Sequence, residues 1–266
     1  MLYGLEEKIE EFKKLIKEDK LRQSYLFFGE SQIGKFTFAA SLVNFLESGE
    51  FAPPAGGRPL IDAEFFLPVD QAGLPDEAGS IGIEAVRQLK KFLYQRPFLS
   101  RRRSAVFDSA ESLTDEAQNA LLKIIEEPPS FSLIIFIAPE ASVFFPTLAS
   151  RFTKIYFSRL SQKLIEKFLR ENFKIDSARA SLIAQQSFGR IGRAIEIMNQ
   201  DTRYKIQDTR DNIGEYLEEL ILSLRKNLFK NSSKLSWLLE REEFLKRYNL
   251  NQKLQYRAIQ NFVNNE

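Results

Sequence analysis

Two short apolar runs joined by one amphipathic pattern, within residues 104–137, constrain the fold more than any other part of the chain. The first run, residues 105–107, is followed by Asp108, and the second covers residues 133–137. Strands that are apolar throughout are typical of a parallel sheet covered on both faces. A strand, a helix and a strand in this order form a right-handed crossover, and such sheets bind ligands at the carboxyl ends of their strands. The pattern predicts an α/β fold with Asp108 at the ligand-binding edge.

The segment between these two runs has the signals of a helix with defined ends. Thr114 is a suitable N-cap, and Asp115 and Glu116 favour the positive amino end. Pro128 and Pro129 stop the helix. Its apolar residues recur at the spacing of one helix face: Ala117, Ala120, Leu121, Ile124 and Ile125.

A glycine-containing loop lies between another buried strand, residues 24–28, and a helix that runs to about residue 46. The spacing of Gly29, Gly34 and Lys35 matches the phosphate-binding pattern G-x-x-x-x-G-K-[ST], in which backbone N–H groups hold phosphates and the lysine neutralises them. The last position departs from the pattern, because Phe36 stands where a hydroxyl should bind Mg²⁺. Thr37 is one residue further on, roughly 100° around the helix. We predict a true or decayed phosphate loop; the alternative is a tight turn with a solvated lysine.

The composition excludes several kinds of chemistry. The 266 residues include no Cys and no His, so disulfides, imidazole or thiolate metal sites and Ser/His or Cys/His nucleophiles are ruled out. The net charge of +2 does not by itself argue for binding to nucleic acid. The charged amino terminus does not fit a signal peptide, and no apolar run approaches the length of about 18 residues needed to span a bilayer. We expect a cytoplasmic protein without a membrane segment.

The rest of the chain predicts one α/β domain followed by helices. Residues 51–79 are rich in Pro and Gly and are expected to be mostly loop. We expect an α/β domain in residues 1–158, a small three-helix domain in residues 159–200 and a helical domain in residues 201–266. The other predicted elements are helices 5–17, 81–96, 162–173, 177–186 and 191–199, and strands 64–69 and 154–157.

The basic run Arg101, Arg102 and Arg103 precedes the strand that ends at Asp108. It therefore falls at the edge of the sheet away from the predicted ligand site. We expect a solvated turn there, with a contact to DNA phosphates as the alternative.

Several strings of residues resemble one family. In these strings and in its order of elements, the chain resembles the delta prime family of bacterial DNA polymerase III clamp loader subunits, which belongs to the AAA+ class. The resemblance implies a P-loop sheet domain, a helical lid and, in residues 201–266, a shortened form of the family's collar. The matching strings are residues 116–129, similar to AxNALLKxLEEPP; residues 146–151, similar to TIxSRC; residues 81–87, similar to IxIxxIR; and residues 189–194, similar to the sensor 2 segment.

The resemblance also implies roles for individual residues. Arg151 would be an arginine finger that acts in trans on nucleotide held by a neighbouring subunit. Arg193 would lie near a nucleotide, together with the degenerate nucleotide-binding residues Gly29, Gly34, Lys35 and Asp108. ATP and Mg²⁺ would be held by the partner subunit, with residual binding of ADP or ATP by this chain and no metal site of its own. The implied partners are the gamma/tau motor subunits and the delta subunit, and, through the complex, the sliding clamp and primed DNA.

The chain departs from an active ATPase of this class at several positions. Phe36 replaces the hydroxyl, Ser109 follows Asp108 where a second acid would orient water, and Ala138-Pro139 replaces the polar sensor 1 residue. The zinc-binding cysteines of many relatives are absent. The nearest other acid, Glu111, is expected to be solvated. Because phosphoryl transfer needs Mg²⁺ and a positioned water, we predict little or no hydrolysis by this chain.

Two other functions compete with that of a non-hydrolysing clamp loader subunit. A self-sufficient P-loop ATPase or nucleotide kinase would need a hydroxyl at position 36 and an acid beside Asp108, and the sequence has neither. A helical AAA+ scaffold with a decayed loop and no role at a nucleotide is compatible with the sequence.

Overall fold

The computed structural model describes residues 2–54, 59–70, 76 and 79–207. Residues 1–195 form one compact unit, and a second unit begins at residue 196, so that the described part of the second unit is residues 196–207. The predicted collar-like domain, residues 201–266, lies largely outside the described residues. In the described part of the chain, no helix is long and apolar enough to cross a membrane.

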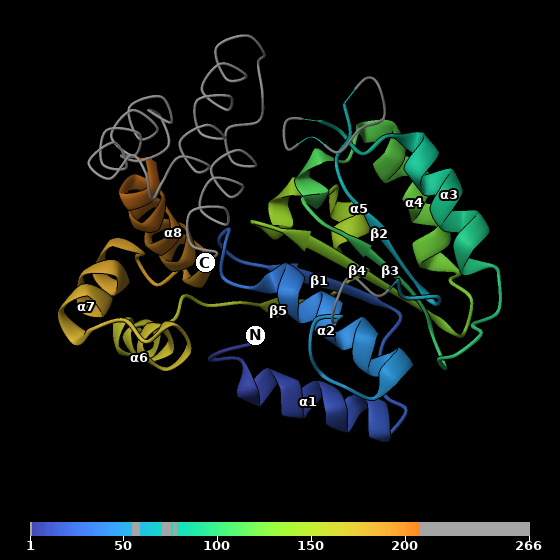
Figure 1. Ribbon diagram of the computed structural model, residues 1–266. Helices are drawn as coiled ribbons and strands as arrows, with labels where there is room; N and C mark the ends of the chain where they lie inside the picture. Colours follow the sequence, from blue (N-terminus) through green and yellow to red (C-terminus); the bar gives the residue numbers. More distant parts are fainter. Residues whose placement is uncertain (1, 55–58, 71–75, 77–78, 208–266) are drawn as a thin grey trace, which may run out of the picture. The chain divides into compact units, whose positions relative to one another are not determined.

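A five-stranded parallel sheet forms the centre of the first unit, with the strand order β2-β3-β4-β1-β5 (Figure 1). The predicted α/β class is therefore confirmed. Because all strands run the same way, the residues that follow β1, β3 and β4 share one edge. The strands are β1 (Ser24–Phe28), β2 (Ala63–Phe66), β3 (Arg103–Phe107), β4 (Ser132–Ala138) and β5 (Thr153–Tyr156).

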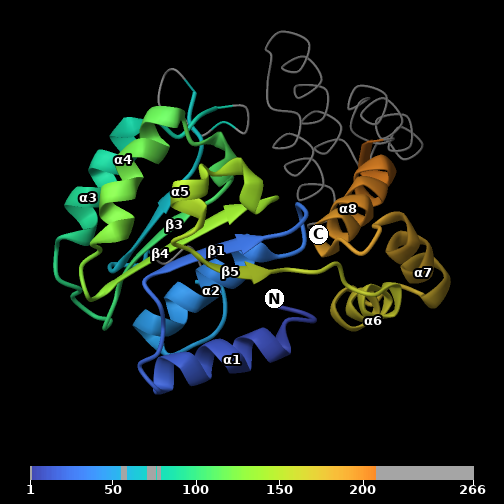
Figure 2. The ribbon, with the colours of Figure 1, turned by 180° about the vertical axis from the view of Figure 1, so that it is seen from behind.

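Helices cover both faces of the sheet (Figures 1 and 2). Phe12 of α1 and Phe38 of α2 pack with Phe27 on one face, whereas the neighbouring Leu26 joins the core beneath the helices of the other face. This alternation follows from the two-residue period of a strand. The first face is covered by α1 (Glu6–Lys17) and α2 (Lys35–Ser48), and the second by α3 (Ile83–Leu93), α4 (Asp115–Glu126) and the short α5 (Pro146–Ala149).

Three further helices follow β5: α6 (Gln162–Phe173), α7 (Ser177–Gln186) and α8 (Ile191–Gln207). Side chains cap the first two, as Ser161 accepts the N–H of Leu164 and Asp176 accepts the N–H of Arg179. The bounds of α6 and α7 agree with the predicted helices, whereas α8 continues beyond residue 199. The division into domains at residues 158 and 200 stays a prediction.

The expectation of a solvated basic turn before β3 is wrong for two of its three arginines. Arg101 is exposed, but Arg103 is only 8% exposed, and its guanidinium donates to the Asp62 carboxylate at 2.8 Å. Arg102 donates to the carbonyl oxygens of Leu21 and Ser130, each at 3.2 Å. The partners lie 28 to 81 residues away along the chain, so local sequence did not reveal them.

Candidate functional site

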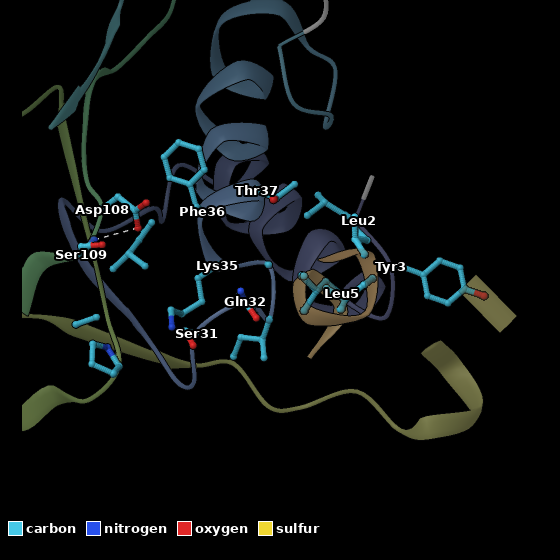
Figure 3. Close-up of a pocket in the computed structure, with 18 of the residues that line it drawn as sticks. Leu2, Tyr3, Leu5, Ser31, Gln32, Lys35, Phe36, Thr37, Asp108 and Ser109 are labelled. Carbon is cyan, nitrogen blue, oxygen red and sulfur yellow. Dashed lines mark hydrogen bonds between the residues drawn. The ribbon is translucent and has the colours of Figure 1, made fainter. Parts of the chain in front are cut away.

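A cavity of about 410 Å³ opens at the carboxyl edge of the sheet (Figure 3). One wall is the loop and first helical turn from Ser31 to Thr37, and another is formed by Asp108 and Ser109, which follow β3. The remaining lining residues come from the amino terminus, a short 3₁₀ turn, the end of β4 and the start of α8: Leu2, Tyr3, Leu5, Glu111, Ile137, Ala138, Pro139, Ile191, Gly192 and Ile195. The structure thus brings together the predicted residues Gly34, Lys35 and Asp108.

The glycines of the loop are required by its backbone. Gly29 has φ +137°, and a Cβ atom there would lie 2.3 Å from the carbonyl oxygen of Phe157. Gly34 adopts a left-handed conformation at the N-cap of α2, where no side chain caps the helix. Lys35, Phe36 and Thr37, the first turn of α2, all line the cavity. The amino end of α2 therefore faces the cavity, which is an arrangement suited to an anion.

Lys35 is folded back onto its own loop. Its side chain is 7% exposed, and its ammonium group donates to the carbonyl oxygens of Gly29 and Glu30, the latter at 2.7 Å. Burial lowers the pKa of Lys35, against the opposing charges of Glu111, Asp108 and Glu30. The lysine thus satisfies two carbonyl oxygens of its own loop.

An apolar ring occupies the position at which the pattern G-x-x-x-x-G-K-[ST] has the hydroxyl that binds Mg²⁺. Phe36 is 40% exposed on the cavity wall, and its ring centroid lies 5.7 Å from that of Phe65 in β2. Asp108 accepts the N–H of its neighbour Ser109 at 3.0 Å (dashed in Figure 3). Burial raises the pKa of Asp108, with the Ser109 N–H and Lys35 acting in the opposite direction. Phe36 therefore offers no oxygen to Mg²⁺ at this position, whereas Lys35 and the N–H groups at the amino end of α2 are groups that could hold a phosphate.

The sequence predicted the exposure of Glu111 but not its place in the cavity wall. Its side chain is exposed, as expected, but it lines the cavity and is the acid with the largest electrostatic effect on Lys35. The 3₁₀ turn Ala110–Ser112, which begins after the left-handed Ser109, returns the chain to the cavity. The described residues that line the cavity include one cation, Lys35, and two carboxylates, Asp108 and Glu111.

The start of α8 packs directly on the loop between β1 and α2. The N–H of Gly192 donates to the carbonyl oxygen of Gln32 at 2.8 Å, and a Cβ atom at Gly192 would lie 2.8 Å from the Cβ atom of Gln32. Gly192 lines the cavity, whereas the guanidinium carbon of Arg193 lies 5.5 Å from the centre of the Phe188 ring. Placing Arg193 at a nucleotide stays a prediction, and the contact between Gly192 and Gln32 was not foreseen.

Arg151 lies at the amino ends of the strands, opposite the carboxyl ends where the cavity opens. It precedes β5, while the cavity lies beyond the ends of β1, β3 and β4. Its guanidinium donates to the carboxylate of Glu126 at 2.5 Å and to the carbonyl oxygen of Thr147, and its side chain is 36% exposed. A strand of four or five residues separates the two edges by on the order of 15 Å, so Arg151 does not serve the cavity of its own chain.

The family described as DNA polymerase III, delta subunit, matches residues 4–161, which is more than half of the chain. The chain belongs to this family. The predicted resemblance to the family of DNA polymerase III clamp loader subunits of the gamma/tau/delta prime type is confirmed.

Known relatives carry related names. DNA polymerase III subunit gamma/tau of Mycoplasma pneumoniae is 27% identical over 203 residues, which cover 73% of this chain and 29% of that protein. DNA polymerase III subunit delta' of Bacillus subtilis is 24% identical over 192 residues, which cover 70% of this chain and 56% of that protein. The match thus spans about a third of the gamma/tau relative and little more than half of the delta' relative.

A solved structure supports the fold. The RuvB Holliday junction branch migration motor of Thermotoga maritima matches with a TM-score of 0.52 at 14% identity, over 77% of this chain and 64% of that chain. At this identity, the likeness concerns the fold alone. The solved structure therefore agrees with the predicted α/β fold and says nothing about function.

Proposed function

We propose that this chain is a delta prime-type subunit that does not hydrolyse ATP and that supplies Arg151 to the nucleotide site of a neighbouring gamma/tau-type subunit. In this role it helps a cytoplasmic complex, which also contains a delta subunit, to load the sliding clamp onto primed DNA. One observation carries the proposal: the altered cavity and the exposed Arg151 lie at opposite ends of the strands of one sheet. The cavity has no hydroxyl at position 36, and Ser109 rather than an acid directly follows Asp108, while an exposed arginine lies at the opposite edge of the sheet.

The chemistry of the cavity supports the first half of the proposal. A triphosphate there would meet Lys35 together with the carboxylates of Asp108 and Glu111. With Phe36 in place of the Mg²⁺ ligand, the charges of the phosphates and the carboxylates would remain uncompensated. Phosphates can still accept N–H groups at the amino end of α2, so we expect residual binding of ADP or ATP without turnover.

The setting of Arg151 supports the second half. A guanidinium is planar, always charged and able to bind phosphate oxygens through two N–H groups. Its partner Glu126 is on the last turn of α4 and is 49% exposed, so exchanging this ion pair for a phosphate of another subunit requires no change in the core.

The trans role is tested in a reconstituted loader in which the only competent ATPase site is the one next to this chain. Arg151→Ala is expected to lower single-turnover hydrolysis at that site by roughly 10³-fold or more, since fingers supplied in trans are worth about 10³ to 10⁵. Arg87→Ala is the matched control, because Arg87 also pairs with a glutamate, Glu84, on an exposed helix face.

A second control separates a finger from a structural ion pair. Glu126→Gln removes the partner and leaves the guanidinium, so hydrolysis is expected to stay within about twofold of the wild-type rate, within ordinary surface-pair effects. If Arg151→Ala has no effect, or if Glu126→Gln reduces hydrolysis as much as Arg151→Ala does, then Arg151 acts only within this chain. That outcome favours the scaffold hypothesis.

A further inference from the structure

Three buried phenylalanine rings meet beside the segment that carries Arg151. Phe152 directly follows Arg151, Phe144 lies just before α5, and Phe136 lies in β4. The ring centroids are 4.9 Å apart for Phe136 and Phe152, 5.2 Å for Phe144 and Phe152, and 5.7 Å for Phe136 and Phe144. Each ring therefore contacts both of the others, and we call Phe136, Phe144 and Phe152 the aromatic triangle.

The aromatic triangle is attached to the middle of the sheet. Phe136 stacks on Phe107 of β3, with ring centroids 4.9 Å apart, and Phe107 stacks in turn on Phe66 of β2, with ring centroids 4.5 Å apart. These three residues occupy paired positions on neighbouring strands, so their rings form a row across the sheet. Close-packed rings in a core have little freedom to shift. The position of Phe152 is therefore fixed by the core of the domain.

Phe152 is the only buried residue in the connection between α5 and β5. This connection consists of Ser150, Arg151 and Phe152, and the first two are exposed. The helix before it, α5, has only four residues, which is too short for a helix to be stable without tertiary contacts. Leu148 is buried on the amino side of Arg151, and Phe152 on the carboxyl side. These two buried side chains, rather than the helix itself, hold the main chain of Arg151.

We infer that Phe152 is a positioning residue for Arg151, an inference that rests on the proposed role of Arg151 in trans. A guanidinium that reaches the nucleotide of another subunit must leave its own chain in a defined direction. A displacement of about 1 Å can cost about 10²-fold in rate. Phe152 sets this direction because its ring fixes the connection onto Phe136 and Phe144. The family string TIxSRC has a cysteine at this place, so the aromatic anchor is a departure of this chain from that string.

The test uses the reconstituted loader in which the only competent ATPase site is the one next to this chain. Phe152→Leu keeps a large apolar side chain and is expected to fold. Single-turnover hydrolysis is measured over a range of ATP concentrations, and the maximal rate is expected to fall roughly tenfold or more. The ATP concentration that gives half of this rate should stay within about twofold, because the neighbouring subunit holds the ATP. A loss of stability alone would not produce this split.

Phe66→Leu is the matched control. Phe66 is buried in the same core cluster as Phe152 but lies at the far end of the row of rings. The substitution removes a comparable ring without touching the connection, so the maximal rate should stay within about twofold of the wild-type rate. In an Arg151→Ala background, Phe152→Leu should cause no further loss, because Phe152 acts through the guanidinium.

Hydrogen exchange in the isolated full chain gives a readout that needs no nucleotide. The N–H groups of Ser150 and Arg151 donate to the carbonyl oxygens of Pro146 and Leu148, both at 3.1 Å. These two amides are expected to exchange at least about tenfold faster in Phe152→Leu than in the wild type, and to be unchanged in Phe66→Leu.

Four results would each overturn the inference: an unchanged maximal rate in Phe152→Leu, an equal loss of rate in Phe66→Leu, a further loss in the Arg151→Ala background, or unchanged exchange of both amides. The proposed function fails by a different result, which is Arg151→Ala without effect on hydrolysis. If Arg151→Ala lowers the rate and Phe152→Leu does not, only the positioning role is refuted.

Discussion

Asp62→Asn tests the buried network that organises the amino edge of the sheet. In the native chain the carboxylate accepts three N–H groups, those of Phe98, Leu99 and Ser100, and the guanidinium of Arg103. The amide keeps one acceptor oxygen, turns an NH₂ group toward donors and leaves the buried guanidinium without an anionic partner. Removing one partner of a buried ion pair typically costs about 3 to 5 kcal/mol, and we expect about 3 kcal/mol here. For a domain of this size, that is a fall in Tm of roughly 6 to 12 °C.

The dependence on pH gives a second measure of the same network. Burial alone would raise the pKa of Asp62, but the three N–H groups and Arg103 hold it below its ordinary value. A carboxylate with a lowered folded pKa contributes stability above its unfolded pKa, and this contribution disappears as the pH falls through the folded pKa. The difference in stability between wild type and Asp62→Asn should therefore be full at pH 7 and should shrink below about pH 4.

Urea denaturation followed by circular dichroism measures the free energy of unfolding, and hydrogen exchange reads the amides of Phe98, Leu99 and Ser100 directly. We expect these three amides to lose protection in Asp62→Asn. Glu84→Gln, which removes one side of an exposed pair, is the control and should cost no more than about 0.5 kcal/mol. A cost for Asp62→Asn below about 1 kcal/mol, or three amides that stay protected, would refute the assignment of Asp62 as the anchor of this loop.

Three further changes test the local structure. Thr114→Ala removes the hydroxyl that caps α4 and should cost about 1 kcal/mol, whereas Thr114→Ser should be nearly neutral; equal melts of the three proteins would contradict the cap. Gly29→Ala should lower the free energy of unfolding by at least about 3 kcal/mol, because the backbone would be strained and the new Cβ atom would lie 2.3 Å from a carbonyl oxygen. Gly49→Ala is the control in the same urea titration; Gly49 has a positive φ but open space around it, so the loss should be about 1 kcal/mol. Phe36→Thr restores a hydroxyl but leaves no acid at position 109, so release of phosphate from ATP by the isolated chain should stay at background. Turnover near about one per second would contradict the inference that the missing acid also prevents hydrolysis.

The candidate site could be predicted from sequence where its chemistry is local. The pattern around Gly29, Gly34 and Lys35 specifies a turn and a helix start, and the strand before Asp108 brings that acid to the same edge. Glu111 was underestimated because its distance from Lys35 depends on a 3₁₀ turn that no periodicity marks. The partner of Arg103 was missed because Asp62 is 41 residues away along the chain.

The sequence by itself determined the elements of this protein. Apolar strands, a 3.6-residue period and the cap at Thr114 are consequences of steric preference and local hydrogen bonding, which act over a few residues. Only the tertiary structure decided that Gly192 packs on the loop between β1 and α2, that Arg103 is buried, and that Phe98 stays in solvent. Burial and pairing depend on which distant segments meet, and that is settled by the packing of the sheet and its helices rather than by any short string of residues.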